Sequence, residues 1–366
     1  MRYLVSIGIV SIFLIWLHQS PLGNGLPFPK VGCETHTTFR DSDGWQASSD
    51  NIAVRTLWQK TEDRPILEMF NGAENSGIAV LPDRVIFHSV FWEQNPDAVL
   101  PSCTEQEIVA FDLLTGDPQW RYPLSQEYSR PYRRIHALSD GVVIVLDGIL
   151  MKLDSEGQYV WSNEGFPSRS IDTIYEDSNN LYLPSKTKFY VVSNETGELL
   201  QITNTHLISV LNGNIISAVD ESRIQIQLVG NQERFEIPIN DPTIRNADIV
   251  PFTDIVNDIL LVFEQIGFRR SIEAYSLVNG QLLWMSEDPF EGLPVVSGDY
   301  VYAYRDLSIE ILEVSTGHQI GTIDLTATGE RQLNISPYEV WIASYDNILI
   351  INIRDTWDII ALQIDA

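Results

Sequence analysis

The sequence is poor in basic residues, with 23 Lys and Arg against 50 Asp and Glu, and its formal net charge is −27. A field of this sign repels nucleic acid and anionic lipid headgroups, so direct binding to DNA, RNA or a membrane surface is not expected. We interpret the acidity as a surface feature that keeps the protein soluble. The sequence also lacks low-complexity tracts and long charge runs, which predicts a chain folded nearly to its C-terminus.

The common catalytic and cofactor motifs are missing as well. The sequence contains no GxGxxG, GxxxxGK[ST], HExxH, CxxC or GxSxG segment. Its six histidines show no metal-ligand spacing, and structural roles are the favoured interpretation for them. Residues 41–44, DSDG, have the start of a calcium loop without its later ligands, which favours an Asx turn in a linker. We therefore expect no metal, no cofactor and no enzymatic activity.

One apolar run stands at the N-terminus. Residues 4–17, LVSIGIVSIFLIWL, follow Arg2, and they are shorter than the roughly 20 residues of a membrane span. The run predicts an apolar helix within a signal peptide over residues 1–25, with an uncleaved membrane anchor as the alternative. Both place the remaining chain outside the cytoplasm: secreted, periplasmic, or held at the outer face of the cell membrane by this segment alone. Residues 26–52 are expected to form a linker.

Only two cysteines occur, Cys33 and Cys103. An even number of cysteines in an oxidising compartment predicts a disulfide, and two unpaired thiols are the alternative. Such a bond would close a long loop and contribute about 4 kcal/mol in the chain-entropy model. Neither cysteine directly follows the apolar run, so a lipidated N-terminal cysteine is not predicted.

Helical periodicity is absent after the N-terminal run, and short strand-like segments take its place. One group reads LPVV at 293–296, YVYAY at 300–304, IEILEV at 309–314 and QIGTI at 319–323. Similar groups recur about 40 residues apart, the length that one four-stranded propeller blade needs. Most groups contain a turn with glycine before the last strand: Thr115-Gly116, Glu156-Gly157, Thr196-Gly197, Val229-Gly230, Asn279-Gly280 and Thr316-Gly317.

This spacing predicts an all-β fold, a β-propeller of four-stranded antiparallel blades over residues 53–366. Seven modules follow residue 76, so a seven-bladed ring is expected, with an eight-bladed ring as the alternative. Residues 53–59, AVRTLWQ, form an extra strand. This strand either closes the ring against the last blade or belongs to a degenerate eighth blade. We expect a monomer.

The first glycine turn carries a longer motif. Residues 110–120 read AFDLLTGDPQW and match AxDxxTGxxxW, the tryptophan-docking motif of PQQ-like propellers. Glycine supplies φ > 0, Asp and Thr bond across the turn, and the Trp packs over the small Ala and locks adjacent blades. Partial matches at other turns strengthen the resemblance to this quinoprotein-type family, within the broader class of WD40- and YVTN-like propellers. The candidate docking residues are Ala110, Asp112, Thr115, Gly116, Trp120, Gly157, Trp161, Gly197, Gly280, Trp284 and Gly317.

The resemblance implies function in two directions. Quinoprotein alcohol dehydrogenases hold pyrroloquinoline quinone and Ca²⁺ and carry adjacent cysteines over the cofactor, and this sequence has no Cys-Cys pair. In size the chain is similar to the propeller component of the outer-membrane β-barrel assembly machinery, which binds proteins without a cofactor. We expect an extracytoplasmic, non-catalytic scaffold for protein binding or assembly. A PQQ-dependent dehydrogenase-like enzyme and a ligand-sensing cell-surface propeller are the alternatives.

Basic and aromatic residues gather in two connections between predicted strands. Strands alternate in direction, so the connections between second and third strands share one face of the ring with those between blades. Arg and Tyr are favoured at protein interfaces, which predicts a partner-binding patch there; pairing with the protein's own carboxylates is the alternative. The candidates are Tyr128, Arg130, Tyr132, Arg133 and Arg134, together with Phe268, Arg269 and Arg270.

Overall fold

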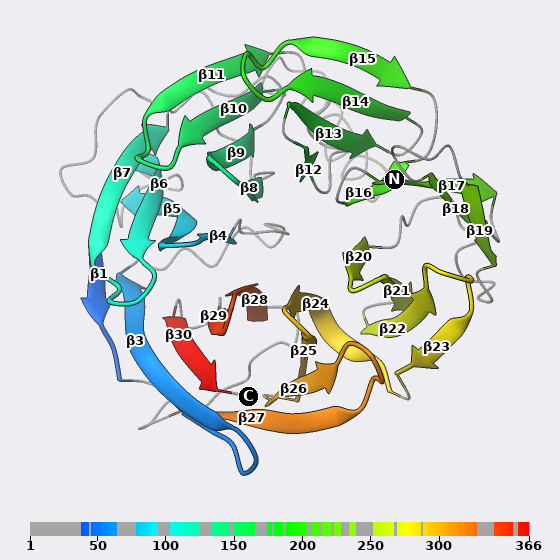
Figure 1. Cartoon of the computed structure of the whole chain (residues 1–366). Coiled ribbons are helices and arrows are strands. Elements are labelled where there is room, and N and C mark those ends of the chain that lie inside the picture. Colours follow the sequence, from blue (N-terminus) through cyan, green and yellow to red (C-terminus); the bar gives the residue numbers. More distant parts are fainter. Residues whose placement is uncertain are drawn as a thin grey trace, which may run out of the picture.

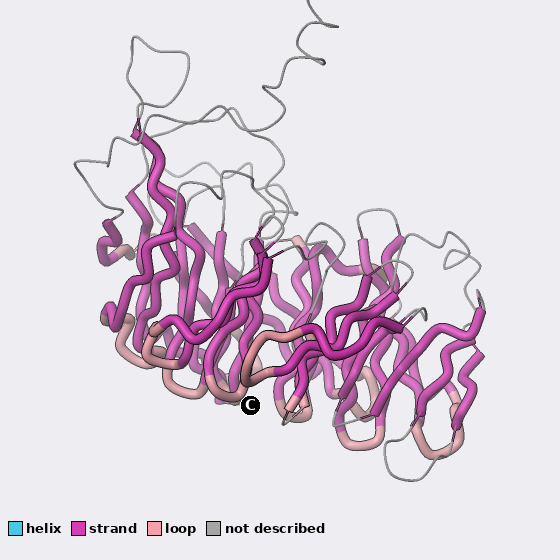
Figure 2. The backbone as a smooth tube through the Cα atoms, turned by 90° about the horizontal axis from the view of Figure 1, so that it is seen from above, coloured by secondary structure: helices cyan, strands magenta, loops and turns pink. Residues whose placement is uncertain are grey.

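The computed structural model describes nineteen stretches of the chain, and all of its regular elements are β-strands (Figures 1 and 2). Within these stretches no helix is both long and apolar enough to span a bilayer. The expected N-terminal helix, the signal segment and Cys33 lie outside them. The described residues are 38–43, 45–63, 78–93, 103–124, 134–146, 149–164, 174–177, 179–185, 188–203, 207–211, 214–220, 223–227, 234–238, 252–266, 269–286, 288–306, 308–327, 340–353 and 358–365.

Consecutive strands pair antiparallel into four-stranded modules that stand around a ring (Figure 1). The strands of a module are called a to d from the inside outward. The first three modules are β4 (Ile78–Leu81), β5 (Arg84–Glu93), β6 (Cys103–Asp112) and β7 (Pro118–Leu124); β8 (Arg134–Leu138), β9 (Gly141–Leu146), β10 (Ile149–Asp154) and β11 (Tyr159–Glu164); and β12 (Tyr175–Glu176), β13 (Asn180–Ser185), β14 (Lys188–Ser193) and β15 (Leu199–Thr203).

The second half of the chain repeats the pattern. Its complete modules are β16 (Leu207–Leu211), β17 (Asn214–Asp220), β18 (Arg223–Gln227) and β19 (Arg234–Pro238); β20 (Phe252–Val256), β21 (Ile259–Ile266), β22 (Arg269–Ser276) and β23 (Leu282–Met285); and β24 (Phe290–Ser297), β25 (Tyr300–Arg305), β26 (Ser308–Glu313) and β27 (Gln319–Ala327). The last three strands are β28 (Val340–Tyr345), β29 (Ile348–Ile353) and β30 (Asp358–Asp365). The all-β propeller with four-stranded antiparallel blades is confirmed.

The described strands form six hydrogen-bonded sheets, so the prediction of seven blades, or of eight, is wrong. The reason is a ladder between two neighbouring modules. The β22 strand is eight residues long but its partner β23 has only four, and the first two residues of β22 pair instead with Phe290 and Glu291 of β24. This pairing fuses the β20–β23 and β24–β27 modules, with one added edge strand, into a single nine-stranded sheet.

An N-terminal strand closes the ring. The β3 strand (Ala53–Asp63) pairs antiparallel with β30, from Ala53 opposite Asp365 to Thr61 opposite Asp358, and so supplies the d strand that the last three strands lack (Figure 1). Of the two alternatives for residues 53–59, closure against the last blade is therefore confirmed. Because β3 and β30 belong to one sheet, the last module has a, b, c and d strands like its neighbours.

The segment before β3 also contributes strands, although residues 26–52 were expected to be a linker. The β1 strand (Thr38–Asp41) pairs with β3, and β2 (Trp45–Ser48) pairs with β27. Both are added at the outer edge of a module. Asp41 ends β1 and accepts a 2.6 Å hydrogen bond from Lys60 Nζ, so the predicted Asx turn begins within a strand.

The core lies between modules. Ile86 and Ile108 of one module share a cluster of buried side chains with Ile144 and Leu153 of the next. A similar cluster joins the β24–β27 module to the closing strands, and another joins these strands to the β4–β7 module. The b and c strands are apolar on both faces because each face is covered by a neighbouring sheet.

A buried carboxylate ties the N-terminal segment to the closing strands. Asp358, at the start of β30, is 0% exposed. Its Oδ2 accepts a 2.8 Å hydrogen bond from Trp45 Nε1, and its Oδ1 accepts another from the Thr61 hydroxyl. One side chain thereby holds β2, β3 and β30 together.

The Asp358→Ala variant should lower the free energy of unfolding by about 1–3 kcal/mol, because it leaves the buried Trp45 and Thr61 donors without this acceptor. Chemical denaturation of the purified protein measures the change. Asp365→Ala, at the exposed end of the same strand, is the matched control and should change stability by less than about 0.5 kcal/mol. Equal effects of the two substitutions would contradict this role for Asp358.

Candidate functional site

A tryptophan on the outer strand of one module lies on the c–d turn of the next. Trp120 of β7 donates from Nε1 to the carbonyl oxygen of Ser155 at 2.9 Å. Its ring covers Gly157, where a Cβ atom would stand 2.5 Å from Trp120 Cδ2. Gly157 has φ +74°, a left-handed conformation that glycine adopts without a steric cost. Glycine is thus required at position 157 for two reasons: the backbone is left-handed there, and the indole leaves no room for a Cβ atom.

The same contact recurs around the ring. Trp161 donates to Asn194 O at 3.0 Å and covers Gly197. Trp284 donates to Val314 O at 2.8 Å and covers Gly317. In each case the tryptophan and the glycine belong to consecutive modules rather than to the same turn. We call these contacts the docking contacts.

Trp58 makes a docking contact that the sequence motif does not reveal. It lies on β3, donates from Nε1 to Leu113 O at 2.9 Å and covers Gly116. No glycine stands four residues before Trp58, as it does before the other docking tryptophans, and its sheet partner β30 lies at the other end of the chain. The only available signal was a tryptophan in the extra strand AVRTLWQ.

The remaining motif residues serve the turn itself. Asp112 Oδ1 accepts hydrogen bonds from the backbone N–H groups of Leu114 and Thr115, at 2.9 and 2.8 Å. Ala110 is buried and stands opposite Trp120 in the β6–β7 ladder. Gly280 has φ +69° in the corresponding turn of the β20–β23 module.

Gly321 occupies the tryptophan position of β27, and a different side chain fills that space. A Cβ at Gly321 would lie 2.3 Å from Ile52 Cδ1, so the N-terminal segment packs where the indole would otherwise stand.

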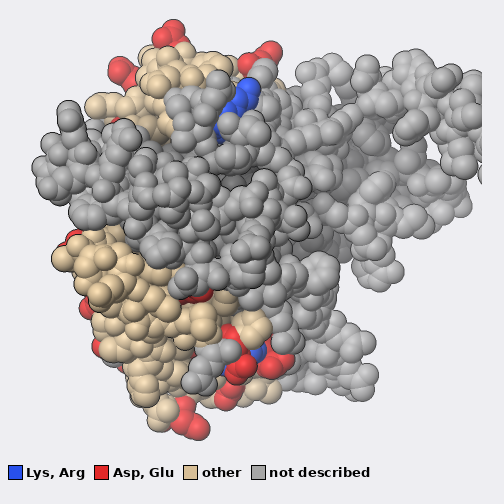
Figure 3. Space-filling view, turned by 90° about the vertical axis from the view of Figure 1, so that its right-hand side faces the viewer, with Lys and Arg blue, Asp and Glu red and all other residues tan. Residues whose placement is uncertain are grey.

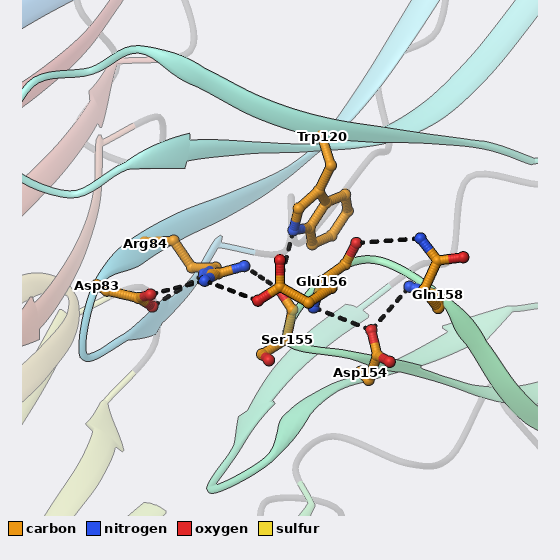
Figure 4. A network of polar contacts seen from close by, with 7 residues as sticks. All are labelled: Asp83, Arg84, Trp120, Asp154, Ser155, Glu156 and Gln158. Atoms are coloured by element: carbon orange, nitrogen blue, oxygen red, sulfur yellow. Dashed lines mark hydrogen bonds and ion pairs between the residues drawn. The ribbon is translucent and has the colours of Figure 1, made fainter.

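An arginine reinforces the joint between the β4–β7 and β8–β11 modules (Figure 4). Arg84 donates to both oxygens of Asp83, at 2.8 and 2.6 Å, and also to the Ser155 carbonyl. Its second ion-pair partner is Glu156, at 3.3 Å. The hydrogen bond from Arg84 is the largest cause that lowers the pKa of Asp83. Arg84 and Trp120 thus reach the same carbonyl, and this cation belongs to the joint.

A lysine occupies the equivalent joint of the next module. Lys152 is only 3% exposed, and its Nζ lies 2.8 Å from both Asp140 Oδ2 and Asn194 Oδ1. Nearby, Glu176 Oε1 accepts a 2.6 Å hydrogen bond from the backbone N–H of Ser139. Burial raises the pKa of Glu176, and the charge of Asp140 adds to this, while the Ser139 bonds and Lys152 oppose it.

The a–b and c–d turns lie together on one side of the ring, which we call the turn face (Figure 2). The turn residues that the structure describes include no lysine or arginine, and the nearby Arg84 and Lys152 are held in joints. Figure 3 shows red carboxylates along the margin of the described surface and little blue. The exposed carboxylates of the turn face that the structure describes are Asp83, Asp117, Asp140, Glu156, Glu195, Glu198, Asp258, Asp299 and Asp346. Three of them pair with the joint cations: Asp83 and Glu156 with Arg84, and Asp140 with Lys152.

Most of the predicted partner-binding patch lies outside the described residues. Tyr128, Arg130, Tyr132, Arg133 and Phe268 lie outside the described residues, as do the side chains of Arg134, Arg269, Arg270 and Cys103. The backbone corrects two assignments. Arg134 begins β8 and stands opposite Val145 in its ladder, so it is not a connection residue. Arg269 and Arg270 begin β22 and are not loop residues, and the ladder sets Arg269 opposite Glu291. Across the described part of the chain, no group of three or more His, Cys, Asp or Glu side chains is arranged to hold a metal ion.

No protein-family model matches the chain, and no curated protein matches it. Among solved structures, the chain is similar to the computationally designed Ika8 protein, with 14% identity and a TM-score of 0.47 over 79% of this chain and 96% of that one. It is also similar to Kluyveromyces lactis Hsv2, with 11% identity and a TM-score of 0.47 over 77% of this chain and 91% of that one. The propeller assignment rests on the strand pairing of this chain itself.

The Gly157→Ala variant should be less stable than Gly298→Ala, although both glycines have positive φ. The control position has no heavy atom within 4 Å of the added Cβ, so it carries only the left-handed backbone cost of about 1–2 kcal/mol. At Gly157 the added methyl also displaces the Trp120 ring, for about 1–3 kcal/mol more. Urea denaturation measures both variants. If they lose the same stability, the docking contact is not an energetic constraint.

The Glu176→Gln variant should be more stable than the wild type at neutral pH. A carboxyl whose pKa is raised by folding destabilises the folded state once pH exceeds the unfolded value of about 4.5, and this loss is complete above the raised pKa. The stability advantage of the variant should therefore grow as pH rises from 5 to 7.5. Thermal unfolding of both proteins across this range is the measurement, and an advantage that shrinks with rising pH would contradict the assignment.

Proposed function

We propose that this chain is a non-catalytic scaffold that binds a protein partner outside the cytoplasm. The observation that supports it best is the turn face, where each module whose turns the structure describes carries an exposed carboxylate, without a lysine or arginine among these turn residues. A surface of one sign attracts a partner of the opposite sign and increases its rate of association. The partner suited to this face is a cationic protein surface.

The joints support the same proposal because they fix the turns. The c–d turns at residues 113–117, 155–158, 194–198 and 314–318 are each held by an indole hydrogen bond from the preceding module. A charged surface on held turns loses less conformational entropy when a partner binds. The described charged groups near the joints are engaged in structure, as Arg84 and Lys152 are, which fits binding better than catalysis.

Two sequence features support the location and the assembly role. The apolar run over residues 4–17 is the length of a signal-peptide core. The AFDLLTGDPQW segment resembles PQQ-like repeats, whose branch of similar size serves outer-membrane protein assembly without a cofactor. The proposal for this chain is accordingly a scaffold in the cell envelope.

Photo-crosslinking in cells that produce the protein natively tests the proposal. Crosslinkers that replace Glu195 and Asp346 on the turn face should capture the same protein, with a yield that falls as ionic strength rises, because exposed charge pairs are screened by salt. Exposed positions on outer strands, Arg121 and Thr326, are the matched controls and should not capture it. Equal capture at all positions, or no captured protein, would count against a docking role for the turn face.

A further inference from the structure

Each module ends outward in a d strand with one side available for further pairing, and the chain covers two of these sides itself. β1 pairs with β3, and β2 pairs with β27 over four residues, from Trp45 opposite Ala327 to Ser48 opposite Asp324. The outer edge of this propeller can therefore accept a fifth antiparallel strand, even a short one.

Most other outer edges carry residues that oppose such pairing. Proline lacks the N–H that a ladder needs, and charges disfavour edge-to-edge contact. The β7 strand contains Pro118 and Pro123, β19 contains Arg234, Glu236 and Pro238, and β11 ends at Glu164. Among the d strands that the structure describes, only β15 and β23 contain neither proline nor a charged residue. Among the described strands, none pairs with the outer side of either.

The β23 edge presents apolar side chains to solvent. Leu282, Leu283 and Met285 are 44%, 46% and 56% exposed, and Val278 on the preceding turn is 73% exposed. Trp284 of the same strand is fixed by its docking contact with Val314, so the edge is held in an extended form. The β15 strand also exposes aliphatic side chains, but its central Gln201 already has an interaction partner.

Carboxylates flank β23 at both ends. At the turn end, the N–H of Leu277 donates to Asp258 O at 2.8 Å, which places the exposed Asp258 beside the β22–β23 turn. At the other end, Asp288 follows the strand closely; its side chain is 76% exposed and one carboxylate oxygen lies 3.5 Å from Arg305 Nη1, on the same protein. An added strand would thus have apolar contacts at its centre and acidic groups at its ends.

We propose that β23 binds an extended segment of a partner protein as a fifth strand. The segment carries alternating apolar residues, which pack on Leu283 and Met285, and Lys or Arg at its ends, which face Asp258 and Asp288. Main-chain hydrogen bonds give affinity in this mode, and side-chain contacts give specificity. A second copy of this chain is disfavoured as the occupant, because its net charge of −27 makes the two copies repel. The inference rests on the proposed function and names one mode of partner binding.

A synthetic peptide, KKVTVTVKK, is the probe. Fluorescence anisotropy with the full chain should show saturable binding below about 1 mM, the weak end of useful affinity for a short segment. An analogue with proline at the second and third valines keeps the charge but loses ladder donors, and it should bind at least about 10-fold more weakly, equivalent to one lost hydrogen bond or more. No binding at 1 mM, or equal binding of the proline analogue, would overturn the proposal.

The location is tested by paired lysine substitutions. Leu283→Lys with Met285→Lys should weaken peptide binding by about 10-fold or more. Leu200→Lys with Ile202→Lys on β15 introduces the same charge on the other uncharged edge and should change affinity by less than about 2-fold. The substituted side chains are all partly or fully exposed, and the urea midpoint of each variant verifies folding. Equal loss in both pairs shows a charge effect only and overturns the assignment to β23.

The peptide assay and the crosslinking experiment fail separately. Crosslinks on the turn face together with an inert β23 edge would leave the scaffold function standing and remove the fifth-strand mode. Peptide binding at β23 without any native crosslinked protein would leave the fifth-strand mode standing and count against the docking role of the turn face.

Discussion

The structure depends on one repeated interaction, an indole lying over a glycine turn of the neighbouring module. Among the described residues four tryptophans make it, at Gly116, Gly157, Gly197 and Gly317, and each donates its N–H to a backbone carbonyl in the turn that it covers. The contact buries a large apolar ring and satisfies its polar group at the same time. Each contact links consecutive modules. Displacing a described module that contributes to a docking contact would therefore disturb its neighbour.

Closure makes these contacts mutually dependent. Trp58 docks on the β4–β7 module from β3, and β3 is hydrogen-bonded to β30 at the other end of the chain. The Asp358 carboxylate, bonded to Trp45 and Thr61, holds the same place. The acidic turns and the apolar β23 edge, which support the binding proposals, are positioned by this closed frame. Arg84 and Lys152 form ion pairs at the joints of this frame, and the described charged residues of the turn face are carboxylates.

The sequence predicted what its local periodicity encodes. Glycine turns about 40 residues apart and the segment from Ala110 to Trp120 gave the propeller, the order of strands and three of the docking tryptophans. It also gave β3 as one of two possible closing arrangements. Long-range pairing was not predictable from local patterns. No repeat precedes Trp58, and the segment with β1 and β2 does not show the period of about 40 residues. The β22–β24 ladder that fuses two modules depends on the unequal lengths of β22 and β23. The exposed β23 edge escaped notice because sequence alone does not show which apolar strand faces solvent.

Native-state hydrogen exchange tests the central claim, that docking contacts and closure by β3 make the ring one cooperative unit. If they do, the slowest amides of β6, β10, β26 and β30 should exchange only through global unfolding, with the same opening free energy in each strand. Substituting Trp58 by alanine should lower all four values together. A series of unequal opening free energies, with modules opening one after another as in an open repeat array, would contradict the account.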